Sequence, residues 1–207
     1  VDGMGDFKLW VGLLDGPNDF EIDAVDRIGN SNTTTYTIVL DTVPPLITVE
    51  EPLDGSWTWA STIGVAGGTD EEAYVTVNGV GAAEWSRSFY MTLSGAEGPF
   101  PIEVVAVDRA GNTASASIVV HIDQTPPTID IATPPDGLVT SAPRVLVVGR
   151  VRDAGSVDLT VQGTPADRAA GSWHAYVDLV EGWNVITVIA EDAAGNRASR
   201  TFKVLLD

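Results

Sequence analysis

The sequence predicts an all-β protein made of tandem immunoglobulin-like, antiparallel β-sandwiches. Apolar residues alternate with polar ones along much of the chain, which is the pattern of half-buried antiparallel strands. Glycine, proline, asparagine and aspartate separate the alternating segments, as turns require. The pattern also repeats along the chain, and no segment has a convincing helical period.

The repeat is clearest in an Asp-x-x-Gly-Asn motif, which begins at Asp26, Asp108 and Asp192, 82 and then 84 residues apart. An aspartate followed closely by a Pro-Pro pair, at Asp41 and again at Asp123, precedes each new unit, and the prolines favour a short, stiff linker. The predicted domains are the C-terminal half of a sandwich in residues 1–43 and two complete sandwiches in 44–125 and 126–207. A half sandwich leaves an apolar sheet face uncovered, so we expect the chain to be a fragment of a longer array.

Seven strands are expected in the last unit, with turn residues between most of them. They cover residues 128–132, 138–140, 144–151, 157–162, 172–179, 184–192 and 197–206. About seven short strands in about 80 residues is typical of an immunoglobulin-like sandwich. Because the chain has no cysteine, it lacks the disulfide core of antibody domains, and its stability must come from packing, linkers and bound ions.

The in-phase apolar residues of the last two strands should form each core. In the unit 44–125 these are Ile102, Val104, Ala106, Ile118, Val120 and Ile122. In the unit 126–207 they are Ile186, Val188, Ala190, Phe202, Val204 and Leu206. The inward face of residues 1–43 carries Phe20, Ile22, Ala24, Tyr36, Ile38 and Leu40. Something else, from this chain or another molecule, should cover that last face.

Composition excludes several classes of function. The chain has 29 acidic and 11 basic residues, and a net charge of −18 repels phosphate backbones, which excludes nucleic-acid binding. No stretch is long and apolar enough to span a bilayer. The two histidines, His121 and His174, are expected to face solvent from strands, and no serine-hydrolase, zinc-protease or phosphate-loop motif is present. We therefore predict that the chain is not an enzyme.

Several segments resemble bacterial and archaeal immunoglobulin-like repeats, among them Gly171 to Trp173, Leu179 to Ile186 and Ala190 to Asn196. The repeat is most similar to domain B of glucodextranase, and the resemblance covers the whole chain. It implies a spacer of the kind found in surface adhesins, surface-layer proteins and secreted hydrolases, located at the cell surface or outside the cell. Fold-level likeness does not assign a function, which must be argued from sites.

Two groups of oxygen-bearing side chains are candidates for binding Ca²⁺. In such a sandwich the hairpin between the last two strands and the loop between the second and third lie at the end where the domain begins. The aspartate before each unit should therefore approach that unit's own hairpin. The candidate ligands are Asp41, Asp108 and Asn112, with Asp70, Glu71 and Glu72 nearby, and Asp123, Asp192 and Asn196, with Asp153 nearby. Hard oxygen ligands suit Ca²⁺, and the resemblance to adhesins with calcium-stiffened junctions favours it. The alternative is that these aspartates only cap turns and solvate an acidic surface.

Exposed aromatic residues and one sequon are the remaining surface candidates. Three aromatic residues occupy equivalent outward positions and should cover a neighbouring strand: Trp10, Tyr90 and Tyr176. Trp59 and Trp183 do not recur, so they are candidates for contact with a neighbour or a sugar, the alternative being plain packing. Asn32, followed by two threonines, is a candidate glycosylation site.

Together these features predict a structural module, such as a stalk, an adhesin or a surface-lattice component, whose partners are copies of itself, other surface proteins or glycans. The alternative is a spacer or carbohydrate-binding region of a secreted polysaccharide-active enzyme. A dedicated carbohydrate-binding module is a third reading, and it would need a planar row of exposed tryptophan or tyrosine residues.

Overall fold

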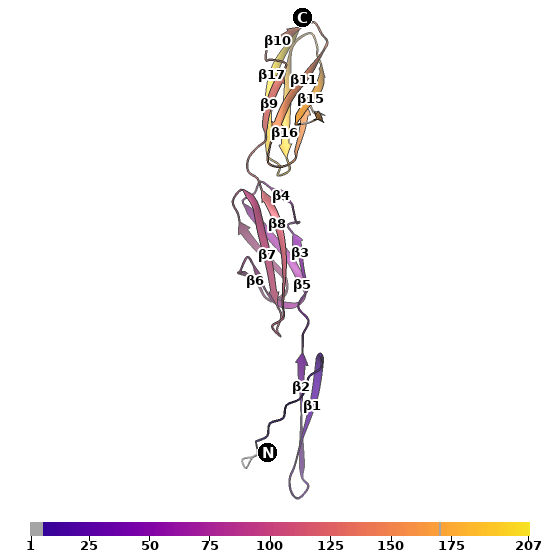
Figure 1. The fold of residues 1–207 in the computed structure, drawn as a ribbon, viewed down its shortest axis with the longest axis vertical. Coiled ribbons are helices and arrows are strands. Elements are labelled where there is room, and N and C mark those ends of the chain that lie inside the picture. Colours follow the sequence, from indigo (N-terminus) through magenta and orange to yellow (C-terminus); the bar gives the residue numbers. More distant parts are fainter. Residues whose placement is uncertain (1–5, 170) are drawn as a thin grey trace. The chain divides into compact units, whose positions relative to one another are not determined.

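The computed structural model describes residues 6–169 and 171–207. These residues form seventeen β-strands and no helix, which confirms the predicted all-β class (Figure 1). In the described part of the chain, no helix has the length and apolar character needed to cross a membrane. Contacts between Cα atoms divide the chain into two compact units, one made of Val1–Thr48, Gly67–Phe89 and Glu103–Ala116, the other of Val49–Ala66, Tyr90–Ile102 and Ser117–Asp207.

Residues 1–43 contribute a two-stranded antiparallel ribbon, made of β1 (Gly16–Val25) and β2 (Ser31–Leu40). Phe20 lies opposite Tyr36, as expected for two residues on one face. Phe20 and Ile22 are half-buried, in a groove that the preceding segment from Phe7 to Val11 also lines. The groove does not cover the whole face.

The expected burial is therefore wrong at Ala24, Tyr36 and Ile38, which are exposed, the last two by 58% and 47%. The physical reason is that this ribbon has no second sheet packed over it among the described residues. The phase of the prediction still holds, because Phe20, Ile22 and Leu40 are the half-buried members of the face.

The next six strands form one hydrogen-bonded network in the order β3-β5-β7-β8-β4, with β6 paired to β5. They are β3 (Ile47–Glu51), β4 (Trp57–Thr58), β5 (Thr62–Val77), β6 (Val80–Ser94), β7 (Gly98–Val107) and β8 (Thr113–Ile122). β5 is long enough to pair with β3, β6 and β7, and the short β4 runs parallel to β8. Of the predicted core residues of this part, all are buried except Ile118, which is half-buried.

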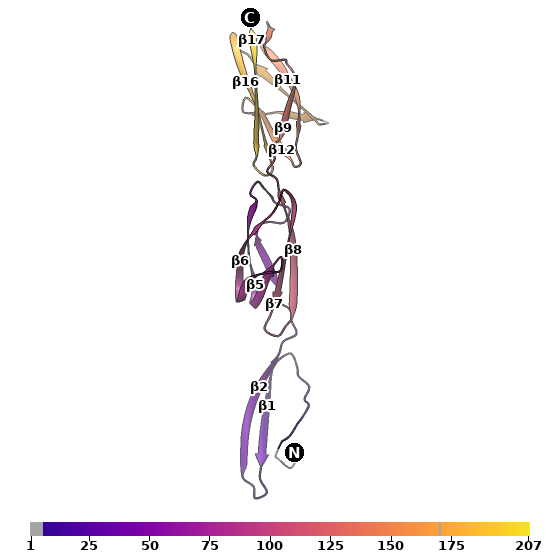
Figure 2. The same ribbon diagram turned by 90° about the vertical axis from the view of Figure 1, so that its left-hand side faces the viewer.

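The last nine strands form two sheets. A five-stranded sheet has the order β10-β17-β16-β12-β13, and a four-stranded sheet has the order β14-β15-β11-β9. Figure 2 shows β16 and β17 on one side of this sandwich and β11 on the other. The strands are β9 (Thr128–Thr133), β10 (Leu138–Thr140), β11 (Arg144–Arg152), β12 (Val157–Val161), β13 (Thr164–Pro165), β14 (Asp167–Ala169), β15 (Ser172–Asp178), β16 (Gly182–Asp192) and β17 (Arg197–Leu206).

All seven strands predicted for this part are present, and β13 and β14 are short additions that the sequence pattern did not indicate. The core between the two sheets contains the predicted residues of β16 and β17, with Leu206 half-buried at its edge. Trp173 on β15 is the largest fully buried side chain of this core. Immunoglobulin-like packing of this kind therefore forms without any disulfide.

Two local devices recur in both sandwiches. The carboxylate of Asp54 accepts a hydrogen bond from the backbone N–H of Val119, and that of Asp136 accepts one from Lys203, each at 2.8 Å. These bonds hold the turn before β4 or β10 against the last strand. A glycine on β5 or β11 also makes room for an aromatic ring: Gly67 faces Phe89, and Gly149 faces Trp173.

Candidate metal centres

The three Asp-x-x-Gly-Asn motifs form the same hairpin turn. In each, one carboxylate oxygen of the aspartate accepts backbone N–H bonds from the following residues, and the other accepts a 2.8 Å bond from the asparagine amide. The glycine has a φ of 94° to 96°, a conformation that residues with a side chain rarely adopt. The motif is thus first a turn device, and the turn-capping interpretation accounts fully for Asp26, which is exposed.

The turn also lowers the pKa of the aspartate in two of the three motifs, Asp26 and Asp108. At Asp26 the hydrogen bond from the Asn30 side chain, followed by the backbone amides, lowers the pKa of the carboxyl. At Asp108 burial by itself raises the pKa, but the hydrogen bonds from the Asn112 side chain and from three backbone amides together outweigh burial, and the pKa is lowered. These aspartates are therefore held as carboxylates, the form that a cation requires.

The same asparagine ties the linker aspartate to the hairpin. The amide of Asn112 donates to the backbone carbonyl of Asp41 at 3.1 Å, and that of Asn196 donates to the carbonyl of Asp123 at 2.8 Å. Both linker aspartates were predicted to approach these hairpins, and the two hydrogen bonds hold them there. The amide nitrogens of Asn112 and Asn196 each donate to two acceptors, and the expectation that these residues are ligands through their side-chain oxygens stays a prediction.

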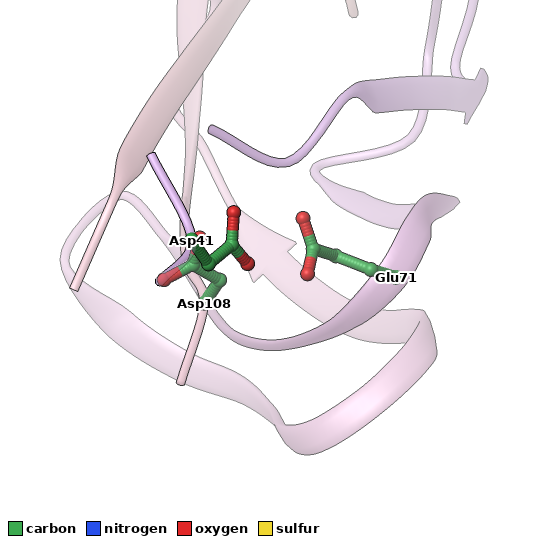
Figure 3. A group of neighbouring side chains, drawn as sticks. All are labelled: Asp41, Glu71 and Asp108. Carbon is green, nitrogen blue, oxygen red and sulfur yellow. The ribbon is translucent and has the colours of Figure 1, made fainter. Parts of the chain in front are cut away.

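A third carboxylate completes each cluster. One oxygen from each of Asp41, Glu71 and Asp108 lies within 4.8 Å of the others, and the same holds for Asp123, Asp153 and Asp192. Figure 3 shows the Glu71 carboxylate facing those of Asp41 and Asp108. Each cluster lies within one of the two compact units. We name them the Glu71 cluster and the Asp153 cluster after their third acid, which comes from β5 in the first cluster and from the loop between β11 and β12 in the second.

The two other acids expected near the Glu71 cluster have different partners. Asp70 accepts a hydrogen bond from the backbone N–H of Leu46 at 2.7 Å, which fastens β5 to the linker. Glu72 forms an exposed ion pair with Arg109 at 3.1 Å. In a strand, neighbouring side chains point to opposite faces, so Asp70 and Glu72 share one face and Glu71 alone of the three points to the face of the cluster.

Burial and, after it, repulsion between carboxylates raise the pKa of the third acid in each cluster. Burial, and then the negative charges of Asp41, Asp108 and Asp70, raise the pKa of Glu71. Burial, and then the charges of Asp123 and Asp192, raise the pKa of Asp153. A cation placed among three such carboxylates would remove this unfavourable term.

The Asp123 carboxylate is buried and has hydrogen-bond partners for only one of its two oxygens. It is only 3% exposed, and its Oδ1 accepts a hydrogen bond from the backbone N–H of Thr125 at 3.0 Å. Its Oδ2 is buried and has no hydrogen-bond partner. A buried, unpaired carboxylate oxygen is costly, so a water molecule or a cation bound at this atom would stabilise it.

The aromatic and sequon candidates lie at the surface. Trp59 and Trp183 are 63% and 59% exposed. The three equivalent aromatic residues are exposed as well: Trp10, Tyr90 and Tyr176. Asn32 is exposed on β2, next to Thr33, whose hydroxyl donates to the Asp23 carboxylate.

The expectation that both histidines simply face solvent needs correction. His121 is half-buried because its ring stacks on Trp57, with ring centroids 4.5 Å apart. The parallel pairing of β4 with β8 places Trp57 beside it. His174 is also half-buried, with its Nε2 atom 3.6 Å from the Asp167 carboxylate.

Comparison with known proteins places these repeats. The family model of glucodextranase domain B matches residues 45–124 and again residues 127–207. The chain belongs to the glucodextranase domain B family. Domain B modules of this immunoglobulin-like type are non-catalytic.

Bacillopeptidase F of Bacillus subtilis (strain 168) is 36% identical over 102 residues, which are 49% of this chain. The match spans only 7% of the length of that relative.

Solved structures show the same fold for this domain B pair. The fibronectin(III)-like modules of Clostridium thermocellum CbhA cover 78% of this chain and 94% of their own, with a TM-score of 0.52 and 19% identity. An I-band fragment from titin covers 80% of this chain and 66% of its own, with a TM-score of 0.51 and 12% identity. At these identities the likeness supports tandem β-sandwiches and nothing more specific.

Proposed function

We propose that this chain is a structural, non-catalytic segment of an extracellular protein, in which immunoglobulin-like modules act as spacers and hold Ca²⁺ at their acidic clusters. The recurrence of a three-carboxylate cluster in two consecutive repeats carries the proposal. Each cluster combines an aspartate of the linker, an aspartate of the hairpin and a third acid, Glu71 or Asp153. A site that recurs with the repeat serves the architecture, whereas one catalytic site per protein would suffice for a reaction.

The chemistry of the clusters favours Ca²⁺ over other ions. Calcium accepts six to eight oxygen ligands at about 2.3–2.6 Å, so two ligands on opposite sides of it are about 4.6–5.2 Å apart. Cluster oxygens within 4.8 Å of one another fit that span. The clusters contain neither histidine nor cysteine, the ligands that zinc and copper prefer. Magnesium binds at about 2.0–2.1 Å and keeps several waters, which suits a contracted, more hydrated site.

An extracellular setting matches such sites, because extracellular calcium modules bind with dissociation constants of about 10⁻⁴–10⁻³ M. The stalk, adhesin or surface-lattice roles share this setting, and their partners would be copies of the chain or other surface proteins. The similarity to bacillopeptidase F, a peptidase by its name, supports a second candidate, a spacer attached to a secreted enzyme.

Calorimetric titration of CaCl₂ into the chelator-treated chain tests the calcium half of the proposal. We expect heat with a dissociation constant of about 10⁻⁴–10⁻³ M and a rise in Tm on binding. The combined variant Asp108→Asn and Asp192→Asn should show neither effect. A wild-type chain that gives no heat and no change in Tm at 10 mM Ca²⁺ (about ten times the weaker constant) would leave the clusters with a turn-capping role alone.

Affinity electrophoresis in gels that contain soluble polysaccharides tests the spacer half. A spacer should migrate at the same rate with and without polysaccharide. Retardation that Trp59→Ala or Trp183→Ala abolishes would instead support the carbohydrate-binding alternative, since these two rings are exposed.

A further inference from the structure

We infer that the Asp153 cluster is the tighter of the two calcium sites and that its ion clamps the Asp123–Thr125 linker and the loop between β11 and β12 to the β16–β17 hairpin. This inference rests on the calcium binding proposed above. It makes the two repeats unequal, although their cluster residues come from equivalent places in the fold. Three features of the structure favour the Asp153 cluster.

The first feature is the unpaired oxygen. Asp123 Oδ2 is buried without a hydrogen-bond partner, and Asp123 is one of the three residues of the cluster. Its other oxygen is already fixed by the Thr125 amide, so the carboxylate cannot turn to find a different donor without breaking that bond. Asp41, its counterpart, has the same bond from Val43 at 3.1 Å but is only half-buried, so water can solvate it. An ion therefore relieves a larger desolvation cost at Asp123 than at Asp41.

The second feature is burial and charge. Asp123 and Asp192 are both buried, whereas Asp108 is the only buried member of the Glu71 cluster. Charges interact more strongly where water is excluded, so the Asp153 cluster attracts a divalent cation more strongly.

The third feature is the length of the third acidic side chain, Asp153 in one cluster and Glu71 in the other. Asp153 has one methylene fewer than Glu71, so fewer side-chain rotations must be fixed when an ion is bound. One of its oxygens already accepts a hydrogen bond from the Gly155 amide at 3.1 Å, which restricts the side chain before binding. This pre-organisation reduces the entropic cost of binding.

The clamp follows from where the three ligands lie in the chain. Residues 153–156 form a loop between β11 and β12. The equivalent residues near Glu71 belong instead to the continuous strand β5. The loop lacks the regular ladder bonds that hold β5, so an ion adds more restraint there. Calcium should therefore slow amide exchange at residues 123–125 and 153–156 more than at residues 70–72.

The test compares two neutral, nearly isosteric variants of the whole chain, Asp153→Asn and Glu71→Gln, by calcium calorimetry and amide hydrogen exchange. Asp153→Asn should weaken the tighter class of sites at least tenfold and abolish the protection of residues 123–125 and 153–156. Glu71→Gln should leave both intact and remove only the weaker class. Asp158→Asn, an exposed change of the same charge on β12, is the matched control and should behave as wild type.

Thermal melts in chelator verify that each variant is folded. A tighter class that survives Asp153→Asn, or that Glu71→Gln removes, would overturn the inference. So would two classes of equal affinity, or calcium protection that is confined to residues 70–72. A wild-type chain without any calcium heat would overturn the calcium binding itself, which separates failure of the proposed function from failure of this ranking.

Discussion

Replacing Gly149 by alanine tests the close packing between β9, β11 and β15. A Cβ atom at this position would lie 2.2 Å from the carbonyl oxygen of Asp130 and 2.4 Å from Cζ2 of Trp173. Neither neighbour can withdraw easily, because Asp130 belongs to the β9–β11 ladder and Trp173 is 1% exposed. Overpacking of this kind costs about 1–3 kcal/mol, and we expect the upper end, about 3 kcal/mol.

Alanine also restricts the unfolded chain, which offsets about 0.4–1 kcal/mol. The net loss of about 2 kcal/mol should lower the Tm of the last sandwich by about 8–16 °C, at about 4–8 °C per kcal/mol for a domain of this size. Differential scanning calorimetry measures the shift. Gly67→Ala should have a similar effect on the preceding sandwich, since its Cβ would lie 2.2 Å from the carbonyl of Thr48 and 2.5 Å from Cζ of Phe89. Gly12→Ala, with nothing within 4 Å, is the control. A Gly149→Ala protein that melts within about 2 °C of wild type would refute the packing argument.

Three further predictions concern single polar groups. Asp136→Ala removes the acceptor for the Lys203 amide and should lower stability by about 1 kcal/mol, seen in urea unfolding, whereas exposed Asp158→Ala should not. Asp153→Asn should raise the Tm of the metal-free chain at pH 7, because the raised pKa of Asp153 means that its ionisation opposes folding; a lower Tm in chelator would contradict this. The lowered pKa of Asp108 has the opposite sign: its stabilisation is present above the unfolded pKa of about 3.9 and is lost as pH falls through the lower folded value. Thermal melts between about pH 2 and 5 should therefore show a loss that Asp108→Asn flattens, and parallel curves would contradict the sign.

The fold was predictable because its signals are local and repeated. Alternation in segments such as Asn184–Asp192 specifies both the strand and its buried face. The recurring Asp-x-x-Gly-Asn turn aligns the repeats, and this alignment was enough to predict that Asp123 approaches Asp192. Burial of the ribbon in residues 1–43 was not predictable, since alternation shows which face is apolar but not what covers it. The Trp57–His121 stack depends on a parallel pairing between distant segments, which periodicity does not report.

The candidate metal centres were predictable in position but not in composition. Asp70, Glu71 and Glu72 are chemically similar neighbours, and only the strand phase and the Leu46 contact decide that Glu71 alone joins the cluster. The asparagines were expected as ligands because their side chains carry oxygen. Their nitrogens donate to the aspartates on both sides, which the sequence did not indicate, and their role as ligands through the side-chain oxygen stays a prediction.

Comparison of the three hairpins separates turn chemistry from metal chemistry. Asp26 has the same amide and asparagine bonds as Asp108 and Asp192, yet among the described residues it belongs to no group of three carboxylates. The motif is therefore sufficient for the turn and insufficient for a site. At the other two hairpins, an aspartate of the linker and a third acid, Glu71 or Asp153, join the aspartate of the turn. Neither addition takes part in the turn, and the pKa of Glu71 and of Asp153 is raised first by burial and then by the neighbouring carboxylates. Two carboxylates that the turn does not need, and that recur in both repeats, make these two clusters able to bind a metal ion, whereas the Asp26 hairpin has only its turn.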